Sequence, residues 1–189
     1  MILFTPGIEC HTHEYIRTGS FDSKFGFGIE YLNTLFNRIS NTKHLKLKGL
    51  HAHIGSQIFE LDPHKDLGEI MVKVILDAKK FGHNIEELNV GGGLGIRYTE
   101  SDDPPSIDEW VKTISSSVVE ACKKNNLDFP TLMCEPGRSI VSTAGITIYK
   151  IGAFKEIPGI RTYLSVDGGM SDNPRPITCL LYTSDAADE

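Results

Sequence analysis

Three consecutive glycines, Gly91–Gly93, follow directly after the apolar segment Leu88–Val90. Each glycine adds to the entropic cost of ordering the backbone, so a triplet indicates that the main chain must approach another group closely. Two interpretations are open at this point. The backbone N–H groups could bind a phosphate, or the triplet could form a tight turn between a strand and a loop. The triplet alone favours neither.

Strand-like and helix-like segments alternate through the first three quarters of the chain. Apolar residues at helical spacing predict helices over residues 28–39, 62–81 and 107–122. Short apolar segments predict strands at residues 1–5, 45–53, 88–90 and 131–134. This alternation implies parallel strands joined by helical crossovers, with ligand-binding groups at the carboxyl ends of the strands.

Local signals predict where two of the helices begin. Asp62 stands before Pro63, which is typical of an N-cap carboxylate followed by proline at the first helical position. Ser106 and Glu109 have the spacing of a capping box. In the helix that follows, residues 107, 110, 111, 114, 118 and 122 are expected to form the buried stripe.

The pattern changes after Arg138. Residues 146–151 and 162–166 are rich in β-forming residues with no long helix between them, which predicts a second, β-rich segment. The predicted fold class is therefore α/β, a partial (β/α)8 TIM-like barrel over residues 1–142 followed by the start of a C-terminal β domain over residues 143–176. Because a closed barrel takes about 250 residues, we expect the chain to be a fragment. Residues 177–189 are expected to be a non-native tail.

Composition argues against several classes of protein. The formal net charge is -6 with no basic cluster, so nucleic acid and anionic membranes are not expected as partners. No apolar run is long enough to span a membrane, and the chain has no secretory signal pattern. The four cysteines are widely scattered without a C-x-x-C pair, which favours reduced thiols over disulfides or a zinc site. A cytoplasmic location is expected.

Two histidines, His51 and His53, end the second predicted strand. Alternate residues of a strand point the same way, so the pair could hold a metal, as in barrel hydrolases. Such a site needs ligands from later strands, and no histidine occurs after His83. We therefore predict no metal. His51 is expected to pack in the core or rim, whereas His53, close to Gly55 and Ser56, is expected at a pocket mouth.

Two acidic residues end later strands. Glu135, three residues before Arg138, could accept a hydrogen bond from a ligand while the arginine binds an anion. The alternative is a local ion pair with a Pro-Gly turn. Asp167, before two glycines, is by itself typical of an ordinary turn.

In combination, these motifs resemble the diaminopimelate decarboxylase family of fold type III pyridoxal-phosphate enzymes, which have an alanine-racemase-like barrel. The resemblance covers about residues 2–176. The matching motifs, in chain order, are His11–Gly19, Ser23–Gly26, His51–Gln57, Gly91–Gly95, Cys134–Ser139 and Val166–Pro176. The resemblance implies pyridoxal 5′-phosphate as the cofactor and meso-2,6-diaminopimelate as the amino acid substrate, which would yield L-lysine and CO2. It also implies a homodimer with a shared active site in the full-length enzyme.

The resemblance implies a role for each matching cofactor residue. His53 would stack on one face of the pyridine ring, and Glu135 would bond the pyridine nitrogen, which makes these two the expected catalytic residues. A carboxylate there keeps the ring nitrogen protonated, so that the ring can accept the electron pair left by departing CO2. The expected phosphate cup consists of Ser56, Gly91, Gly92, Gly93, Pro136, Gly137 and Arg138.

The resemblance also implies substrate contacts. Arg138 and Arg175 would bind substrate carboxylates, a task suited to the guanidinium fork, and Asp167 would lie near the substrate amino group. The family's Schiff-base lysine has no matching position, since neither Lys24 nor Lys46 corresponds to it. We therefore expect this polypeptide to be inactive by itself.

Three other functions share part of this pattern. Another fold type III decarboxylase, of the ornithine or arginine type, is disfavoured by Arg17–Gly19 and Arg175. A non-catalytic pyridoxal-phosphate-binding protein would lack the β-rich segment after residue 142. A metal-dependent barrel hydrolase would bind zinc at His51 and His53.

Overall fold

The first part of the chain is built on a parallel β-sheet. The computed structural model describes residues 1–8, 19 and 23–173. Contacts divide the chain into two units, Met1–Ser142 and Thr143–Glu189. The five-stranded sheet of the first unit has the order β2-β1-β3-β4-β5, and all its strand pairs are parallel. Its strands are β1 (Ile2–Thr5), β2 (Phe27–Gly28), β3 (Gly49–His51), β4 (Glu87–Asn89) and β5 (Thr131–Met133).

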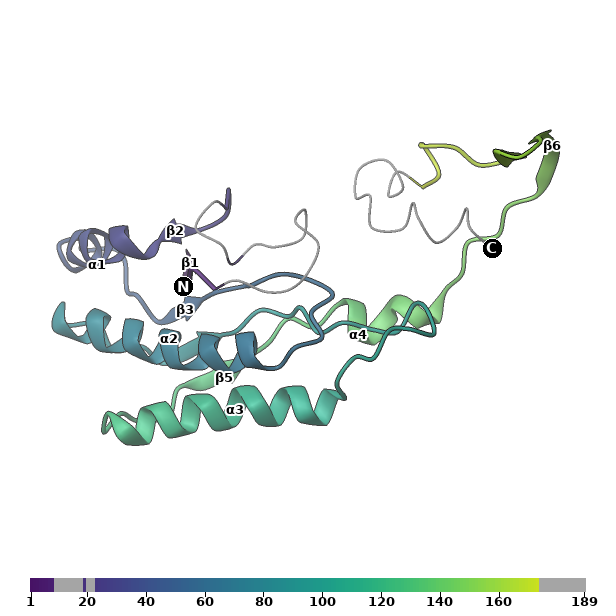
Figure 1. Ribbon diagram of the computed structural model, residues 1–189. Coiled ribbons are helices and arrows are strands. Elements are labelled where there is room, and N and C mark those ends of the chain that lie inside the picture. The colour runs from purple at the N-terminus through teal and green to yellow at the C-terminus, as the bar shows by residue number, and fades with distance from the viewer. Residues whose placement is uncertain (9–18, 20–22, 174–189) are drawn as a thin grey trace. The chain divides into compact units, whose positions relative to one another are not determined.

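Helices connect β2 to β3, β3 to β4 and β4 to β5 (Figure 1). Their bounds are α1 (Leu32–Ser40), preceded by a 3-10 turn at Ile29–Tyr31, α2 (Asp62–Lys80) and α3 (Ile107–Lys124). A short helix, α4 (Arg138–Val141), follows β5, and a 3-10 turn continues it over Ser142–Ala144. This arrangement confirms the predicted parallel α/β architecture. The predicted strand over residues 45–53 is shorter than expected, since only Gly49–His51 pairs as a strand.

The core lies between the sheet and the helices. Leu50 of β3 and Leu88 of β4 are fully buried and occupy paired positions in the register, and Leu132 of β5 is the next partner. Phe36 of α1 and Leu67 of α2 are equally buried on the helix side. Apolar burial of this kind provides the main stabilisation of the first unit.

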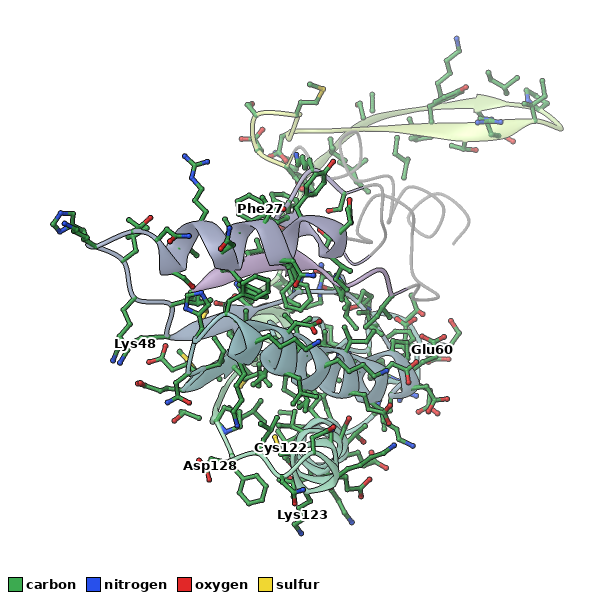
Figure 2. All side chains as sticks on the ribbon, turned by 90° about the vertical axis from the view of Figure 1, so that its left-hand side faces the viewer. Phe27, Lys48, Glu60, Cys122, Lys123 and Asp128 are labelled. Atoms are coloured by element: carbon green, nitrogen blue, oxygen red, sulfur yellow. The ribbon has the colours of Figure 1, made fainter. Side chains whose placement is uncertain are left out.

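Helix α3 confirms one local prediction and corrects another. Ser106 accepts a hydrogen bond from the backbone N–H of Glu109, and the Glu109 side chain accepts one from the Ser106 backbone, so the capping box is present. Ile107 and Val111 are exposed, so their placement in the buried stripe was wrong. The stripe is narrower because α3 buries only the side that faces α2 and the sheet. Figure 2 shows Cys122 on that inner side and Lys123 pointing outward.

Helix α2 begins differently from the sequence prediction. Its N-cap residue is Leu61, and no side chain caps the helix, so the prediction of Asp62 as N-cap was wrong. Asp62 lies instead in the first turn, where its charge stabilises the positive end of the helix dipole. Pro63 is also in this first turn, where its missing N–H removes no helical hydrogen bond.

The second unit contains an antiparallel hairpin. Strands β6 (Ile151–Ile157) and β7 (Arg161–Val166) pair around a turn in which Gly159 has a positive φ of 73°. The strand predicted at residues 146–151 was therefore placed too early, and only the predicted strand at 162–166 matches closely. Across the described residues of both units, every helix is too short or too polar to cross a membrane.

Candidate active site at the carboxyl ends of the strands

A cavity of about 360 Å³ opens at the carboxyl ends of the strands in the first unit. Residues from β1, the segment before β2, β3 and the segments that follow β3, β4 and β5 form its wall. The lining residues are Leu3, Phe4, Thr5, Phe25, His51, His53, Gly92 and Glu135. Three residues predicted to belong to one site, His53, Gly92 and Glu135, therefore share one cavity. They are distant in sequence and meet because neighbouring parallel strands end at the same edge.

His53 is tied to the glycine loop by a hydrogen bond. The Gly92 N–H donates to Nδ1 of His53 over 3.3 Å, so the proton of the neutral ring resides on Nε2. Burial lowers the pKa of His53 below its ordinary value, and repulsion from His51 adds to this effect. The negative charge of Glu135 raises the pKa of His53, but by less than burial and His51 lower it. A neutral, half-buried imidazole therefore faces the cavity.

Close packing explains why the loop after β4 needs glycine. Gly91 has a φ of 68°, in the left-handed region, and an added Cβ there would lie 2.6 Å from His53 Nδ1. A Cβ on Gly92 would collide with the backbone carbonyl oxygen of Glu135. The loop thus fills the narrow space between the ends of β3 and β5. Its glycines are required by these neighbours, independently of any phosphate.

The N–H groups of the triplet are not equally available. The Gly91 N–H donates to Oδ1 of Asn89 over 2.9 Å, and the Gly92 N–H donates to His53. Within the part of the chain that the structure describes, the Gly93 N–H has no acceptor. Among the described residues, Gly93 is therefore the glycine of the triplet whose N–H donates to no other group.

Glu135 is held by groups from two neighbouring strands. Its Oε1 accepts a hydrogen bond from Nδ2 of Asn89 over 2.8 Å, and its Oε2 lies 3.6 Å from Nε2 of His51. Its backbone N–H donates to the Gly91 carbonyl over 2.7 Å. The side chain is nevertheless 57% exposed, so these contacts, more than burial, determine where the carboxylate points.

Arg138 stacks on Tyr98. The guanidinium carbon lies 5.6 Å from the centre of the Tyr98 ring, and Nη1 donates to the Tyr98 hydroxyl over 2.6 Å. Asp102 orders the loop that carries Tyr98, because its carboxylate accepts the backbone N–H groups of Tyr98 and Thr99. These bonds lower the pKa of Asp102. The predicted anion-binding arginine is therefore packed against an aromatic ring that a neighbouring loop positions.

The remaining predicted residues have the following positions. Ser56 is half-buried directly after Gly55, whose carbonyl oxygen would lie 2.6 Å from a Cβ added to Gly93. Pro136 and Gly137 connect Glu135 to the start of α4. In the second unit, Asp167 accepts a hydrogen bond from the Lys150 N–H over 2.8 Å at the end of the hairpin. Arg175 lies outside the described residues, as do His11–Thr18.

Several residues of this site were not predicted from the sequence. Asn89 touches both the glycine loop and Glu135, and Thr5 and Phe25 line the cavity. His51 was expected only as a core or rim residue, yet it lies in the cavity wall beside Glu135. One signal was present: an asparagine at the end of a buried strand needs partners for both its amide atoms.

The segment that carries this site matches a known protein family. Residues 1–142 match the family described as pyridoxal-dependent decarboxylase, pyridoxal binding domain. The chain belongs to the pyridoxal-dependent decarboxylase family. Pyridoxal 5′-phosphate, the cofactor predicted from the sequence, is thereby confirmed as the cofactor of this family.

Individual members of the family are close in sequence and structure. A diaminopimelate decarboxylase from Synechocystis is 58% identical over 94% of this chain, and one from Staphylococcus aureus is 45% identical over 90%. The crystal structure of diaminopimelate decarboxylase from Helicobacter pylori complexed with L-lysine superimposes with a TM-score of 0.78 at 29% identity over 92% of this chain. These matches confirm the predicted resemblance and the barrel-type fold.

The chain is shorter than these relatives. It spans 38% of the Synechocystis protein, 40% of the Staphylococcus aureus protein and 41% of the Helicobacter pylori chain. The matched region contains the five parallel strands and the cavity at their carboxyl ends.

Proposed function

We propose that the whole protein decarboxylates meso-2,6-diaminopimelate to L-lysine and CO2, and that the cavity described above holds its pyridoxal 5′-phosphate. The observation that supports this most directly is the convergence of His53, Gly92 and Glu135 in one cavity. The similarity to diaminopimelate decarboxylases, one of them solved with L-lysine, supports the choice of substrate.

The donor set of the cavity fits this cofactor. Glu135 offers a carboxylate oxygen that can accept the N–H of a protonated pyridine, and His53 offers a flat neutral ring to pack on the pyridine face. When bound, pyridoxal phosphate supplies a protonated aromatic ring that accepts the electron pair released by the departing carboxylate. The task of Glu135 is to keep that proton on the ring nitrogen, and the task of His53 is to orient the ring.

On the phosphate side, we assign the Gly93 N–H, the Ser56 loop and the Glu135–Arg138 segment to the cup. Arg138 has a positive charge that Tyr98 positions, so it can neutralise either the phosphate or a substrate carboxylate. Asp167 and Arg175 stay assigned to the substrate as a proposal. Asp167 orders the end of the hairpin through Lys150, which would fix its carboxylate.

The other features of the proposal concern the whole protein. We propose that the second unit begins a β domain, that the protein acts in the cytoplasm, and that two copies share each active site. The antiparallel hairpin of the second unit supports the first of these. The similarity to diaminopimelate decarboxylases supports an amino acid substrate.

Binding of a cofactor analogue to this chain tests the cavity. 4′-Deoxypyridoxine 5′-phosphate lacks the aldehyde, so its binding reports the cavity without a covalent bond to lysine. We expect saturable binding in a fluorescence titration, weakened about tenfold or more by His53→Ala and by Glu135→Gln. Glu120→Gln, on the exposed face of α3, is the matched control and is expected to bind normally. If both variants bind the analogue as tightly as wild type, the assignment of the cavity is contradicted.

A chimera tests the substrate. Residues 1–173 would replace the matching segment of the Staphylococcus aureus diaminopimelate decarboxylase, and CO2 release would be measured with three amino acids. We expect release from meso-diaminopimelate and none from ornithine or arginine. Preference for ornithine or arginine would favour the alternative decarboxylase class instead.

A further inference from the structure

Asn89 occupies a special position in the site. It is the last residue of β4, two residues before Gly91, and the residue is only 4% exposed. A buried side-chain amide must find partners for both its oxygen and its nitrogen, because unpaired polar atoms are costly inside a protein. Asn89 finds both within the site itself.

The two partners of Asn89 lie on different segments. Its Oδ1 accepts the Gly91 N–H over 2.9 Å, and its Nδ2 donates to Oε1 of Glu135 over 2.8 Å. An N–H can bond only to the amide oxygen, and a carboxylate oxygen can bond only to the amide nitrogen. The orientation of the amide group is therefore fixed by its neighbours.

The register of the sheet explains why Asn89 can reach Glu135. Asn89 pairs with His51 on β3 and with Met133 on β5, so the three side chains stand on the same face. Glu135 is two residues beyond Met133 and returns to that face. Asn89 thus donates a hydrogen bond to Oε1 of Glu135, and His51 lies near Oε2 of the same carboxylate. In the described part of the chain, His51 and His53 are titratable groups that face this carboxylate.

We propose that Asn89 is a positioning residue for cofactor chemistry: its amide nitrogen directs the Glu135 carboxylate into the cavity, while its amide oxygen fixes the glycine loop. This inference rests on the proposed function of Glu135 as the partner of the pyridine nitrogen. Because Glu135 is more than half exposed, burial alone does not fix its side-chain rotamer, and the hydrogen bond to Asn89 supplies the missing constraint.

An amide suits this position better than a carboxylate. An aspartate has only acceptor oxygens when ionised, so Asn89→Asp would keep the bond to the Gly91 N–H but lose the donor to Glu135. It would also place a second negative charge beside the first. Asn89→Ala would lose both bonds. The two variants therefore separate the role toward Glu135 from the role toward the glycine loop.

The first measurement needs no cofactor. Amide hydrogen exchange of Gly91 is expected to be faster in Asn89→Ala and close to wild type in Asn89→Asp, because only the alanine variant lacks the acceptor. Asn33→Asp, an exposed asparagine in α1, is the matched control for added charge. In chains that retain Asn89, its side-chain NH2 resonances are expected to differ between wild type and Glu135→Gln, because the substitution removes the carboxylate that accepts its hydrogen bond.

The second measurement uses 4′-deoxypyridoxine 5′-phosphate labelled with 15N in the ring. Both Asn89 variants are expected to bind it about tenfold more weakly than wild type, as for loss of a hydrogen bond to a charged group. The ring nitrogen is expected to report protonation in wild type and less protonation in both variants. A residue with only a structural role would not move the 15N shift of the bound analogue.

The outcomes are distinguishable. If the unsubstituted chain binds no analogue, the proposed function fails. The Asn89 NH2 resonances still test whether Asn89 contacts Glu135, because that measurement needs no analogue. If Glu135→Gln leaves the Asn89 NH2 chemical shifts unchanged, the inference is overturned. This test remains valid even if both Asn89 variants fail to fold. Variants that fold, bind the analogue normally and leave its ring nitrogen protonated overturn it as well.

Discussion

The rings of His64 and Trp110 meet edge to face between α2 and α3, with their centroids 5.6 Å apart. Both nitrogens of His64 and the Nε1 of Trp110 are buried and have no hydrogen-bond partner among the described residues. Burial lowers the pKa of His64 to about 4, and the nearby His53 contributes in the same direction. The contact between the two helices therefore requires a neutral imidazole.

This contact predicts that acid destabilises the first unit. The folded chain keeps His64 neutral down to about pH 4, whereas the unfolded chain takes up the proton near the ordinary value of 6.5. The unfolded state therefore binds more protons between these values, and the free energy of unfolding falls as the pH decreases from 6.5 to 4. At pH 5 the loss is about 2 kcal/mol by linkage. Urea denaturation at pH 5 and pH 7 measures it.

His64→Leu should remove this part of the pH dependence, since leucine has no proton to bind. His44→Leu, at an exposed histidine, is the matched control and should leave the pH dependence of unfolding in place. Equal pH dependence in wild type and His64→Leu would contradict the assignment.

Close packing of α2 against α3 leads to a second prediction. A Cβ added to Gly68 would lie 2.5 Å from the Ser117 hydroxyl oxygen, which donates to the Lys65 carbonyl. Gly68→Ala should lower the free energy of unfolding, because a clash of about 1–3 kcal/mol outweighs the gain in helix propensity of about 1 kcal/mol. The added Ser117→Ala should recover part of the loss in a double-mutant cycle. Strictly additive effects would show that the two positions do not touch.

The glycine loop provides a third prediction. Gly92→Ala should destabilise the first unit by about 1–3 kcal/mol, since its methyl group would meet the Glu135 backbone carbonyl. Gly145→Ala has open space around the new methyl group and should be close to neutral. Chemical denaturation of both variants gives the comparison. A stable Gly92→Ala chain would show that the loop can move away from Glu135 at little cost.

The bond between Gly92 and His53 provides a fourth prediction. At pH 7 the ring of His53 should be neutral with its proton on Nε2, because Nδ1 accepts the Gly92 N–H and burial lowers the pKa. Nitrogen-15 NMR of the histidine side chains distinguishes the two tautomers directly. The ring should take up its second proton only below pH 6.5. A proton on Nδ1 at neutral pH would exclude this hydrogen bond.

Much of the cavity could be predicted from the sequence because parallel strands end at one edge. His53, Gly92 and Glu135 each follow a recognisable apolar segment, so their convergence needs only the alternation of strands and helices. Asn89 was missed because its role depends on its bond to Glu135, 46 residues away in sequence. The register between β4 and β5 brings Asn89 and Glu135 together. This register depends on how the two strands pair, so it cannot be predicted from the sequence of either segment alone.

The errors in the secondary structure have similar causes. Aspartate is a common N-cap residue, but the backbone is already helical at Leu61. Asp62 therefore lies in the first turn instead of at the N-cap. Ile107 and Val111 fit the apolar period of α3, yet no neighbouring element in the described part of the chain covers that side of the helix. Periodicity indicates which residues could be buried, and packing partners decide which residues are.

Strand β5 lies at one edge of the described sheet, opposite β2, and pairs there only with β4. Leu132 and Met133 are each more than one third exposed, and the backbone bond from Glu135 to Gly91 extends the β4–β5 ladder toward the cavity. The position of Glu135 thus depends on the β4–β5 interface as well as on His51 of β3. Glu135 follows this edge strand by two residues, so any segment that paired with the other side of β5 would restrict the backbone from which the Glu135 side chain projects.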